Sequence, residues 1–563
     1  MAKQWPRFLH NPTTQIMVGL LVLAALAAGV WSRGEQQEAR SPILKDRDAY
    51  MATACELPTQ WVRLIDRGLR SATDSHDLVV QLPPQNSMGG FTSMHSGPFG
   101  FLQDVPLVFY GPGHVPAQGH VRLRSEVTLA DVAPTFGWLL GFDFPSHGRP
   151  LKSVLERGER APKLIMTVVI DGGGWNALER WPDAWPNLAR MIEEGVNLEG
   201  AIVGSSPSVT PASHATLSTG VFPKDHGVTA IQNRHGDGSI VGSFTRTPGE
   251  LGPDVRPRLN LRSPTFADLW DIETGNEAEV GMLSYFNYPL AMLGQGSAWP
   301  GGDDDVLGLQ EDMQWKTTPA FYSLPRYAMS ISPRDDIAAL DRQDGRVDEQ
   351  WMGHLIDEKL DATPALARWI NRTTKAILLN EEFGSDEITD LFFINYKTPD
   401  RVGHRWGMDT PEQRAAISSV DDALGDLIDF MDRHVGSEGY VLLVTADHGQ
   451  RPLSEVRDGW SINGEKLLAD VNAAFDKTDD GRGIIEATSP TLFFLDEEQL
   501  AKNDVHAEDV ASFLSNYTIS DNVSSQADIP QGLRSRKKER VFSAVFPSRN
   551  VDEVLSCADA GDQ

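Results

Sequence analysis

Three apolar runs, each followed within a few residues by an aspartate, constrain the fold of this chain more than any other feature. They are Leu164–Ile170 before Asp171, residues 391–396 before Asp400, and residues 440–444 before Asp447. Helical patterns lie between them, at Pro186–Glu194 and at residues 415–432. Strands that alternate with helices predict a mainly parallel sheet covered on both faces, a three-layer α/β/α sandwich. Ligands of such sheets lie at the carboxyl ends of the strands, so we expect the three aspartates to meet there.

The same patterns predict the remaining elements and the domain organisation. Strands are expected at residues 77–82, 105–110, Val280–Ser284, 491–495 and 540–546, and helices at 48–75, 127–140, 351–379 and Ala507–Ser515. The segments expected along the chain are a basic tail (1–14), an apolar segment (15–32), a linker and helix (33–76), two parts of one core (77–157 and 163–546) and a tail (547–563). A substrate-side insertion is expected around 235–385 within the main part of the core.

Charge and the N-terminal segment limit the partners of the chain. Its 563 residues carry a formal net charge of −29, which argues against a nucleic-acid partner. Lys3 and Arg7 precede a mainly apolar run at residues 16–31, slightly short for a spanning helix of about 17–25 residues. A membrane anchor and a cleaved signal peptide both fit, and we expect the anchor. The rest of the chain should then lie outside the cytoplasm, held at the cell membrane by one span or, after cleavage, secreted.

Candidate metal ligands and a candidate nucleophile follow the strand ends. The ordered set is Asp171, Thr210, Asp400, His404, Asp447 and His448. Carboxylate oxygens and imidazole nitrogens suit zinc and other first-row divalent ions. Two metal ions about 4 Å apart can clamp the attacking and leaving oxygens of a displacement at phosphorus. Metal binding also lowers the pKa of a threonine hydroxyl and so activates it as a nucleophile. The pattern therefore predicts a two-metal centre that acts on phosphate esters.

This order of residues resembles the alkaline phosphatase superfamily, most closely its nucleotide pyrophosphatase/phosphodiesterase branch, to which the segment 299–302 (Trp-Pro-Gly-Gly) is also similar. The resemblance implies an alkaline phosphatase-like fold and two divalent metal ions, with zinc as the usual choice. It assigns Asp400 and His404 to the first metal, assigns Asp171, Asp447 and His448 to the second, and makes Thr210 the metal-bound nucleophile that becomes phosphorylated.

Two further residues receive roles from the resemblance. His214, four residues after Thr210, stands where the family has a histidine beside the nucleophile, and we expect it to orient the turn. Asn233 lies near the position of an asparagine that donates a hydrogen bond to a phosphate oxygen in relatives, although its spacing is slightly long. Such a donor would stabilise charge that develops in the transition state.

The family needs one more metal-binding histidine, downstream of the Asp-His-Gly at 447–449. His506 lies downstream but begins what reads as an exposed helix. His95 lies far upstream, yet residues 104–113 and 128–135 after it are very similar to segments that follow the last metal histidine in the superfamily. The resemblance therefore implies that His95 is the sixth ligand and that the chain is circularly permuted, with the old join between residues 540–546 and 77–82.

Cys55 and Cys557 are the only cysteines and lie near opposite ends of the chain. Taken alone, they fit a disulfide or two unrelated thiols. Because both flank the implied join, the permutation favours a Cys55–Cys557 disulfide that staples the new termini.

The leading expectation is a metal-dependent hydrolase of small phosphate esters or nucleotides, with phosphodiesters or nucleotide pyrophosphates preferred. A phosphomonoesterase is less favoured because no extra lysine or arginine for a doubly charged phosphate stands out. A phosphotransferase acting on membrane or wall polymers would suit an anchor. A sulfatase lacks its Cys/Ser-x-Pro-x-Arg motif, a cytoplasmic phosphoglycerate mutase conflicts with the apolar segment, and a catalytically dead binding protein conflicts with a complete ligand set.

Overall fold

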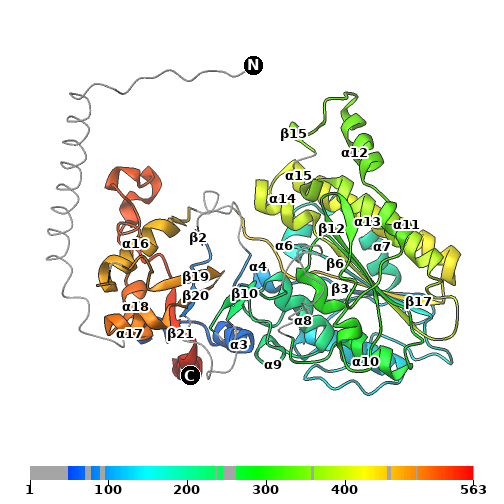
Figure 1. Cartoon of the computed structure of the whole chain (residues 1–563), viewed down its shortest axis with the longest axis horizontal. Helices are drawn as coiled ribbons and strands as arrows, with labels where there is room; N and C mark the ends of the chain where they lie inside the picture. The colour runs from blue at the N-terminus through cyan, green and yellow to red at the C-terminus, as the bar shows by residue number, and fades with distance from the viewer. Residues whose placement is uncertain are drawn as a thin grey trace.

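The computed structural model describes residues 49–69, 78–88, 95–234, 238–244, 261–356, 360–452, 458–478, 480–489 and 491–561. These residues form a large body around a central sheet and a smaller body around a second sheet (Figure 1). The apolar segment at 15–32 and most of the linker lie outside the described residues. In the ranges just given, no helix is long and apolar enough to cross a membrane.

The central sheet of the large body has nine strands in the order β13-β12-β11-β16-β6-β17-β3-β7-β4. Their bounds are Gln314–Lys316, Val306–Glu311, Val280–Ser284, Asp390–Tyr396, Leu164–Ile170, Tyr440–Thr445, Leu107–Tyr110, Val196–Leu198 and Gly119–Val121, respectively. The five strands from β12 to β17 run parallel to one another, whereas β13 and β3 pair antiparallel with the outer two. The expected α/β fold with a mainly parallel sheet is therefore confirmed.

Strand β6 lies in the middle of the sheet and shows why its sequence is continuously apolar. All seven of its residues are buried, with Ile165 and Val169 in the core on one face and Leu164, Met166 and Val168 in the core on the other. Burial of each large apolar side chain of this strand contributes roughly 1.5–3 kcal/mol of hydrophobic stabilisation. Because β16 and β17 pair with β6 in parallel, the three strands end side by side.

Helices cover both faces of this sheet (Figure 1). The helices α7 (Pro186–Glu194), α13 (Pro364–Asn380) and α15 (Pro411–Met431) pack on one face. The helices α5 (Val132–Leu140), α8 (Thr210–Thr219) and α10 (Phe266–Glu273) pack on the other. Further helices around the sheet are α4 (Gly100–Gln103), α6 (Trp175–Leu178), α9 (Pro223–His226), α11 (Arg326–Ser330), α12 (Arg334–Asp341) and α14 (Thr398–Trp406).

The smaller body is built on an antiparallel sheet in the order β19-β20-β1-β21. Its strands span Ile485–Ser489, Leu492–Leu495, Leu78–Gln81 and Ala544–Pro547, respectively, and its helices include α16 (Gly464–Phe475), α17 (Glu497–Asn503) and α18 (Ala507–Ser515). This body has its own hydrophobic core. The sequence assignment joined residues 163–546 in one domain, whereas the structure divides them between two sheets, because strand patterns do not say which sheet a strand joins.

The two ends of the described chain meet in the smaller body. Strand β1 pairs with β21, with Leu78 opposite Pro547 and Gln81 opposite Ala544. The predicted disulfide between Cys55 and Cys557 is present, with the two Cα atoms 5.3 Å apart. The adjacency of β1 and β21 is what a circular permutation requires, and the permutation itself stays a prediction.

Most of the segment 547–563, which we expected to be a C-terminal tail, is helical, because residues Val551–Gly561 form helix α19. Val551, Val554 and Ala558 recur on one helical face and are buried. Helix α19 packs against α3 (Thr59–Gly68), which follows the short helix α2 (Met51–Ala54). The helix expected over 48–75 is therefore two helices, separated where Pro58 precedes α3.

The long helix expected at 351–379 is wrong in its first half. Residues Gln350–Trp351 and His354–Leu355 form a small hairpin, β14 and β15, and the helix begins at Pro364. Gly353 has φ +83° in the turn of this hairpin, a conformation that suits glycine. Strands β11, β12 and β13 also show that the insertion expected around 235–385 supplies one edge of the central sheet. The helix expected at 127–140 begins later, as the short strand β5 (Val127–Thr128) and a 3-10 turn precede α5.

Candidate functional site

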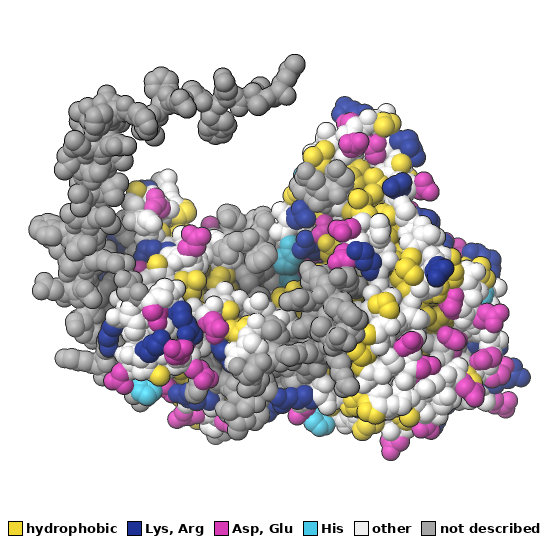
Figure 2. Space-filling model, viewed as in Figure 1, with side chains coloured by type: hydrophobic (Ala, Val, Ile, Leu, Met, Phe, Trp, Pro, Cys, Tyr) yellow, Lys and Arg dark blue, Asp and Glu magenta, His cyan; other side chains and the backbone are white. Residues whose placement is uncertain are grey.

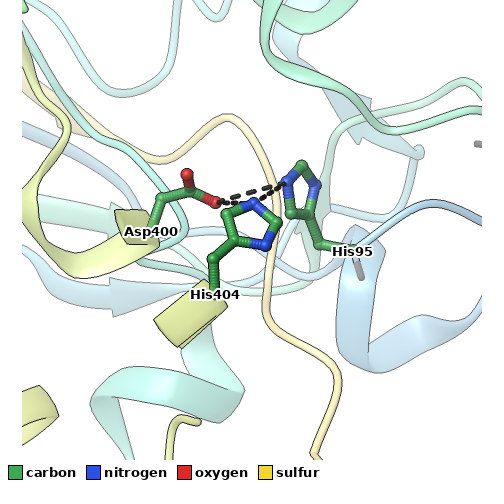
Figure 3. A group of neighbouring side chains, drawn as sticks. All are labelled: His95, Asp400 and His404. Atoms are coloured by element: carbon green, nitrogen blue, oxygen red, sulfur yellow. Dashed lines mark hydrogen bonds and ion pairs between the residues drawn. The ribbon is translucent and has the colours of Figure 1, made fainter. Parts of the chain in front are cut away.

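Three side chains from distant parts of the chain form the first candidate metal-binding group (Figure 3). Asp400 and His404 lie one turn apart on α14, so both project from one face of this helix. His95 comes from the loop before α4. Its Nε2 atom lies 3.1 Å from His404 Nε2 and 3.2 Å from Asp400 Oδ1, and His404 Nε2 lies 3.2 Å from the same oxygen. The structure thus places His95, and not His506, beside the other ligands.

The second group lies at the carboxyl ends of β6 and β17. His448 Nε2 lies 3.3 Å from Asp447 Oδ2 and 3.6 Å from Asp171 Oδ1, and all three residues are fully buried. Burial raises the pKa of Asp171 and of Asp447 to about 6. The His95 ring stacks on the His448 ring with centroids 3.5 Å apart, so the two groups adjoin.

The donor atoms of both groups fit divalent metal ions. Asp447 Oδ2 and His448 Nε2 are buried and have no hydrogen-bond partner among the described residues. Buried polar atoms without partners are costly, and a cation between them would satisfy both. Burial also lowers the pKa of His95 and His448, which favours the neutral imidazole that binds metals. Three nitrogens and three carboxylates in two adjoining groups are a donor set that zinc accepts.

Thr210 is the first residue of α8 and is buried beside both groups. Its Oγ1 accepts a hydrogen bond from Lys397 Nζ at 3.2 Å. No side chain caps this end of α8, which carries partial positive charge and free backbone donors. A negative charge on Thr210, or on a phosphoryl group bound to it, is therefore stabilised by the helix.

His214 has both ring nitrogens occupied. Its Nδ1 lies 2.7 Å from the carbonyl oxygen of Thr210, so this nitrogen carries the proton and donates it. Its Nε2 accepts a hydrogen bond from Asn395 Nδ2 at 3.1 Å, and the same amide donates to Asp171 Oδ2 at 3.0 Å. Although His214 Nδ1 lies 3.8 Å from Asp447 Oδ2, it is committed to the Thr210 carbonyl. The arrangement matches the orienting role expected for His214.

Asn395 and Lys397 are site residues that the sequence analysis missed. Asn395 is a polar residue within the apolar strand β16, and Lys397 directly follows that strand. Lys397 Nζ lies 2.9 Å from Asp171 Oδ1 and 2.8 Å from Asp400 Oδ2. Burial alone would lower the pKa of Lys397, but the aspartates around it raise the pKa above its ordinary value. The available signal was the position of both residues at a strand end close to Asp400.

Two other candidates are not brought into the site by the contacts that the structure describes. Asn233 lies on β9 (Gln232–Arg234), where its Oδ1 accepts from the backbone and hydroxyl of Thr229 and its Nδ2 donates to Ser243. These contacts make it part of a local turn, and its role toward phosphate stays a prediction. His506 is the exposed residue before α18, and its backbone N–H is bonded to Asp509.

Known proteins provide the comparison for this geometry. A family model described as type I phosphodiesterase / nucleotide pyrophosphatase matches residues 165–551, a range that excludes His95. Alkaline phosphatase PafA of Elizabethkingia meningoseptica is 22% identical over 442 residues, covering 67% of this chain and 78% of that protein. Alkaline phosphatase PhoV of Synechococcus elongatus is 23% identical over 349 residues, covering 53% and 60%. The crystal structure of wild-type PafA shares the fold with a TM-score of 0.50 at 17% identity, covering 70% of this chain and 85% of that chain. The chain therefore belongs to the type I phosphodiesterase / nucleotide pyrophosphatase family within the alkaline phosphatase superfamily, and it is a hydrolase of phosphate esters.

Proposed function

We propose that this protein is an extracytoplasmic, two-metal hydrolase that transfers the phosphoryl group of its substrate to Thr210 and then to water. The observation that carries the proposal is the position of Thr210. Its hydroxyl lies at an uncapped helix N-terminus, 3.2 Å from the Nζ atom of Lys397, which contacts Asp171 of one metal-binding group and Asp400 of the other.

The residues of the two groups would hold the metal ions, with His95, Asp400 and His404 on one and Asp171, Asp447 and His448 on the other. When bound, the ions supply Lewis-acid stabilisation of charge and a lowered pKa for an oxygen nucleophile. Thr210 Oγ1, after its proton has passed to solvent, attacks phosphorus while the bond from phosphorus to the ester oxygen breaks. The leaving oxygen takes up a proton from solvent, and the alcohol or nucleotide leaves. Water then attacks the phosphothreonine, which releases the phosphate product and restores the hydroxyl. The N-terminus of α8 stabilises the negative charge on the transferred group in both steps.

His214 and Asn395 position the reacting groups in this scheme. His214 fixes the first turn of α8 through the Thr210 carbonyl, and Asn395 holds both His214 and Asp171. Such support matters because a misplacement of about 1 Å can reduce the rate roughly 100-fold.

The Cys55–Cys557 disulfide supports the proposed extracytoplasmic location, because disulfides persist mainly in oxidising environments. The anchor expected at residues 15–32 would hold the enzyme at the outer side of a membrane. On the face drawn in Figure 2, acidic and basic side chains lie interspersed, as on a solvated surface. A small phosphate ester or nucleotide is therefore the expected partner of the site.

The test uses the full chain after metal removal by a chelator and reconstitution with zinc. Hydrolysis of 4-nitrophenyl phosphate or bis-4-nitrophenyl phosphate should vanish on metal removal and return with zinc. Rapid acid quenching should trap one phosphoryl group on the peptide that carries Thr210. Thr210→Ala should keep the metal content, abolish trapping of the phosphoryl group and reduce turnover by at least about 1,000-fold. Thr210→Ser should retain both the trapping and the turnover. Zinc-loaded protein that hydrolyses neither ester would exclude the proposal, and faster product release with an added alcohol would indicate a phosphotransferase.

A further inference from the structure

A single buried ammonium group joins the two metal-binding groups to the nucleophile. Lys397 is 8% exposed and lies between the end of β16 and the start of α14, so its backbone position is fixed by two elements. Its Nζ contacts Asp171 of one group, Asp400 of the other and the Thr210 hydroxyl, at 2.8–3.2 Å. Lysine has three N–H donors, and these three contacts use all of them.

The neighbouring cation Arg401 is held differently from Lys397. The neighbouring Arg401 is tied to Asp361, which its Nε approaches to 2.5 Å, and Tyr285 donates its hydroxyl to the same carboxylate. The Arg401 guanidinium is therefore paired with a carboxylate that belongs to neither metal-binding group. Lys397, in contrast, shares its carboxylates with the candidate metal ions.

The charge of the loaded centre depends on this residue. The ligand aspartates Asp171, Asp400 and Asp447 carry three negative charges, and two divalent ions would carry four positive ones. Once Thr210 has lost its proton, these charges cancel, and Lys397 leaves the centre with a net positive charge. In a buried site with a low effective dielectric constant, one unit charge strongly changes the affinity for an anion.

We propose that Lys397 is a phosphate-binding residue that selects phosphoryl groups with two negative charges, so that phosphate monoesters are the favoured substrate class. The inference rests on the proposed two-metal function. With the oxygens of Asp171 and Asp400 engaged by metal ions, Lys397 would have N–H donors to turn toward a phosphoryl oxygen beside Thr210. A monoester is close to a dianion above its second pKa of about 6 and has three unsubstituted oxygens, whereas a diester has one charge and two such oxygens.

This proposal departs from the expectation that diesters are preferred, which rested on the resemblance of residues 299–302 to the phosphodiesterase branch and on finding no extra lysine or arginine for a doubly charged phosphate. It also agrees with the names of the alkaline phosphatases that the chain resembles. A purely structural role is the competing explanation, in which Lys397 only neutralises the aspartates before metal binds. The two explanations differ in what happens to anion affinity once the metal ions are present.

The experiment compares zinc-loaded wild-type protein with Lys397→Met and Lys397→Gln, and with Lys316→Met as a control that removes a lysine paired with Glu311 on the surface. Metal content is measured first, and only proteins that hold two ions per chain are compared. The kcat/KM values for 4-nitrophenyl phosphate and bis-4-nitrophenyl phosphate are then determined, together with the Kd for inorganic phosphate from calorimetry. Two different replacements ensure that a folding defect of one of them does not decide the result.

We expect both Lys397 variants to bind phosphate about 10- to 100-fold more weakly, the range for a lost charge-assisted hydrogen bond. The monoester-to-diester ratio of kcat/KM should fall at least about tenfold, and Lys316→Met should change neither quantity. An unchanged phosphate Kd and an unchanged ratio would overturn the inference. If the wild-type protein hydrolyses neither ester, the proposed function fails, while the phosphate Kd still decides the role of Lys397.

Discussion

Replacement of His95 by alanine tests the assembly of the centre from distant segments. His95 is one of three protein ligands in the first group, with its Nε2 within 3.2 Å of both partners. Zinc sites with four protein ligands bind with about 10–16 kcal/mol, so one ligand contributes roughly 2.5–4 kcal/mol. At about 1.4 kcal/mol per factor of ten, His95→Ala should weaken the first metal by roughly 100- to 1,000-fold.

The assay is a zinc titration buffered by a chelator, with bound metal and ester hydrolysis followed on the same samples. His95→Ala should bind the second metal, lose the first at micromolar zinc and recover part of its activity at higher zinc. His506→Ala is the matched control, because His506 is exposed at the start of α18 and its loss should cost at most about 1 kcal/mol of helix stability. Unchanged binding of two ions by His95→Ala, or loss of an ion in His506→Ala, would refute the reasoning.

Three further changes test the scaffold around the centre. His226 is buried with a pKa lowered to about 3, so it stays neutral in the folded state while the unfolded state takes up a proton below about pH 6.5. As the pH drops from 6.5 toward 3, His226 alone should lower the free energy of unfolding by at most about 1.4 kcal/mol per unit, and denaturant curves of His226→Gln should show a loss that is smaller by this amount. Reducing the Cys55–Cys557 disulfide, or replacing both cysteines by serine, removes a link across 502 residues. The loop-entropy model predicts that the free energy of unfolding then falls by up to about 6 kcal/mol, and a measured loss below about 1 kcal/mol would contradict this model. A Cβ on Gly68 would lie 1.8 Å from the carbonyl oxygen of Ser206, so Gly68→Ala should displace the loop that precedes Thr210. We expect a lower melting temperature and a lower kcat, and wild-type values for both would show that α3 does not support this loop.

The strands that carry the ligands could be predicted from the sequence because they are buried on both faces. Leu164–Ile170 has the same bounds in the structure as in the prediction, since an apolar run of this length in a central strand has few other solutions. The adjacency of Asp171, Asp400 and Asp447 follows from parallel pairing of their strands. The position of His95 could be predicted only from the resemblance of the segments after it, because no local pattern connects it with residue 404.

Other features had no readable signal. Asn395 and Lys397 are single polar residues at a strand end, and neither periodicity nor spacing distinguishes such residues from solvated ones. The second sheet was missed because its strands β1, β20 and β21 come from both ends of the chain and their pairing is a long-range event. The hairpin at 350–355 was read as helix because short strands with exposed positions lack a clear alternation.

The separation of 309 residues between His95 and His404 has a consequence for how the enzyme is made. Its first ligand is synthesised early and has no metal-binding partner until residue 404 has been added, and the second group is complete only at His448. A chain that stops earlier holds a lone imidazole and scattered carboxylates instead of a centre that can retain zinc. Zinc is therefore retained only by a chain that has been synthesised past His448 and has folded. A nascent or truncated chain should neither retain the ion nor hydrolyse phosphate esters.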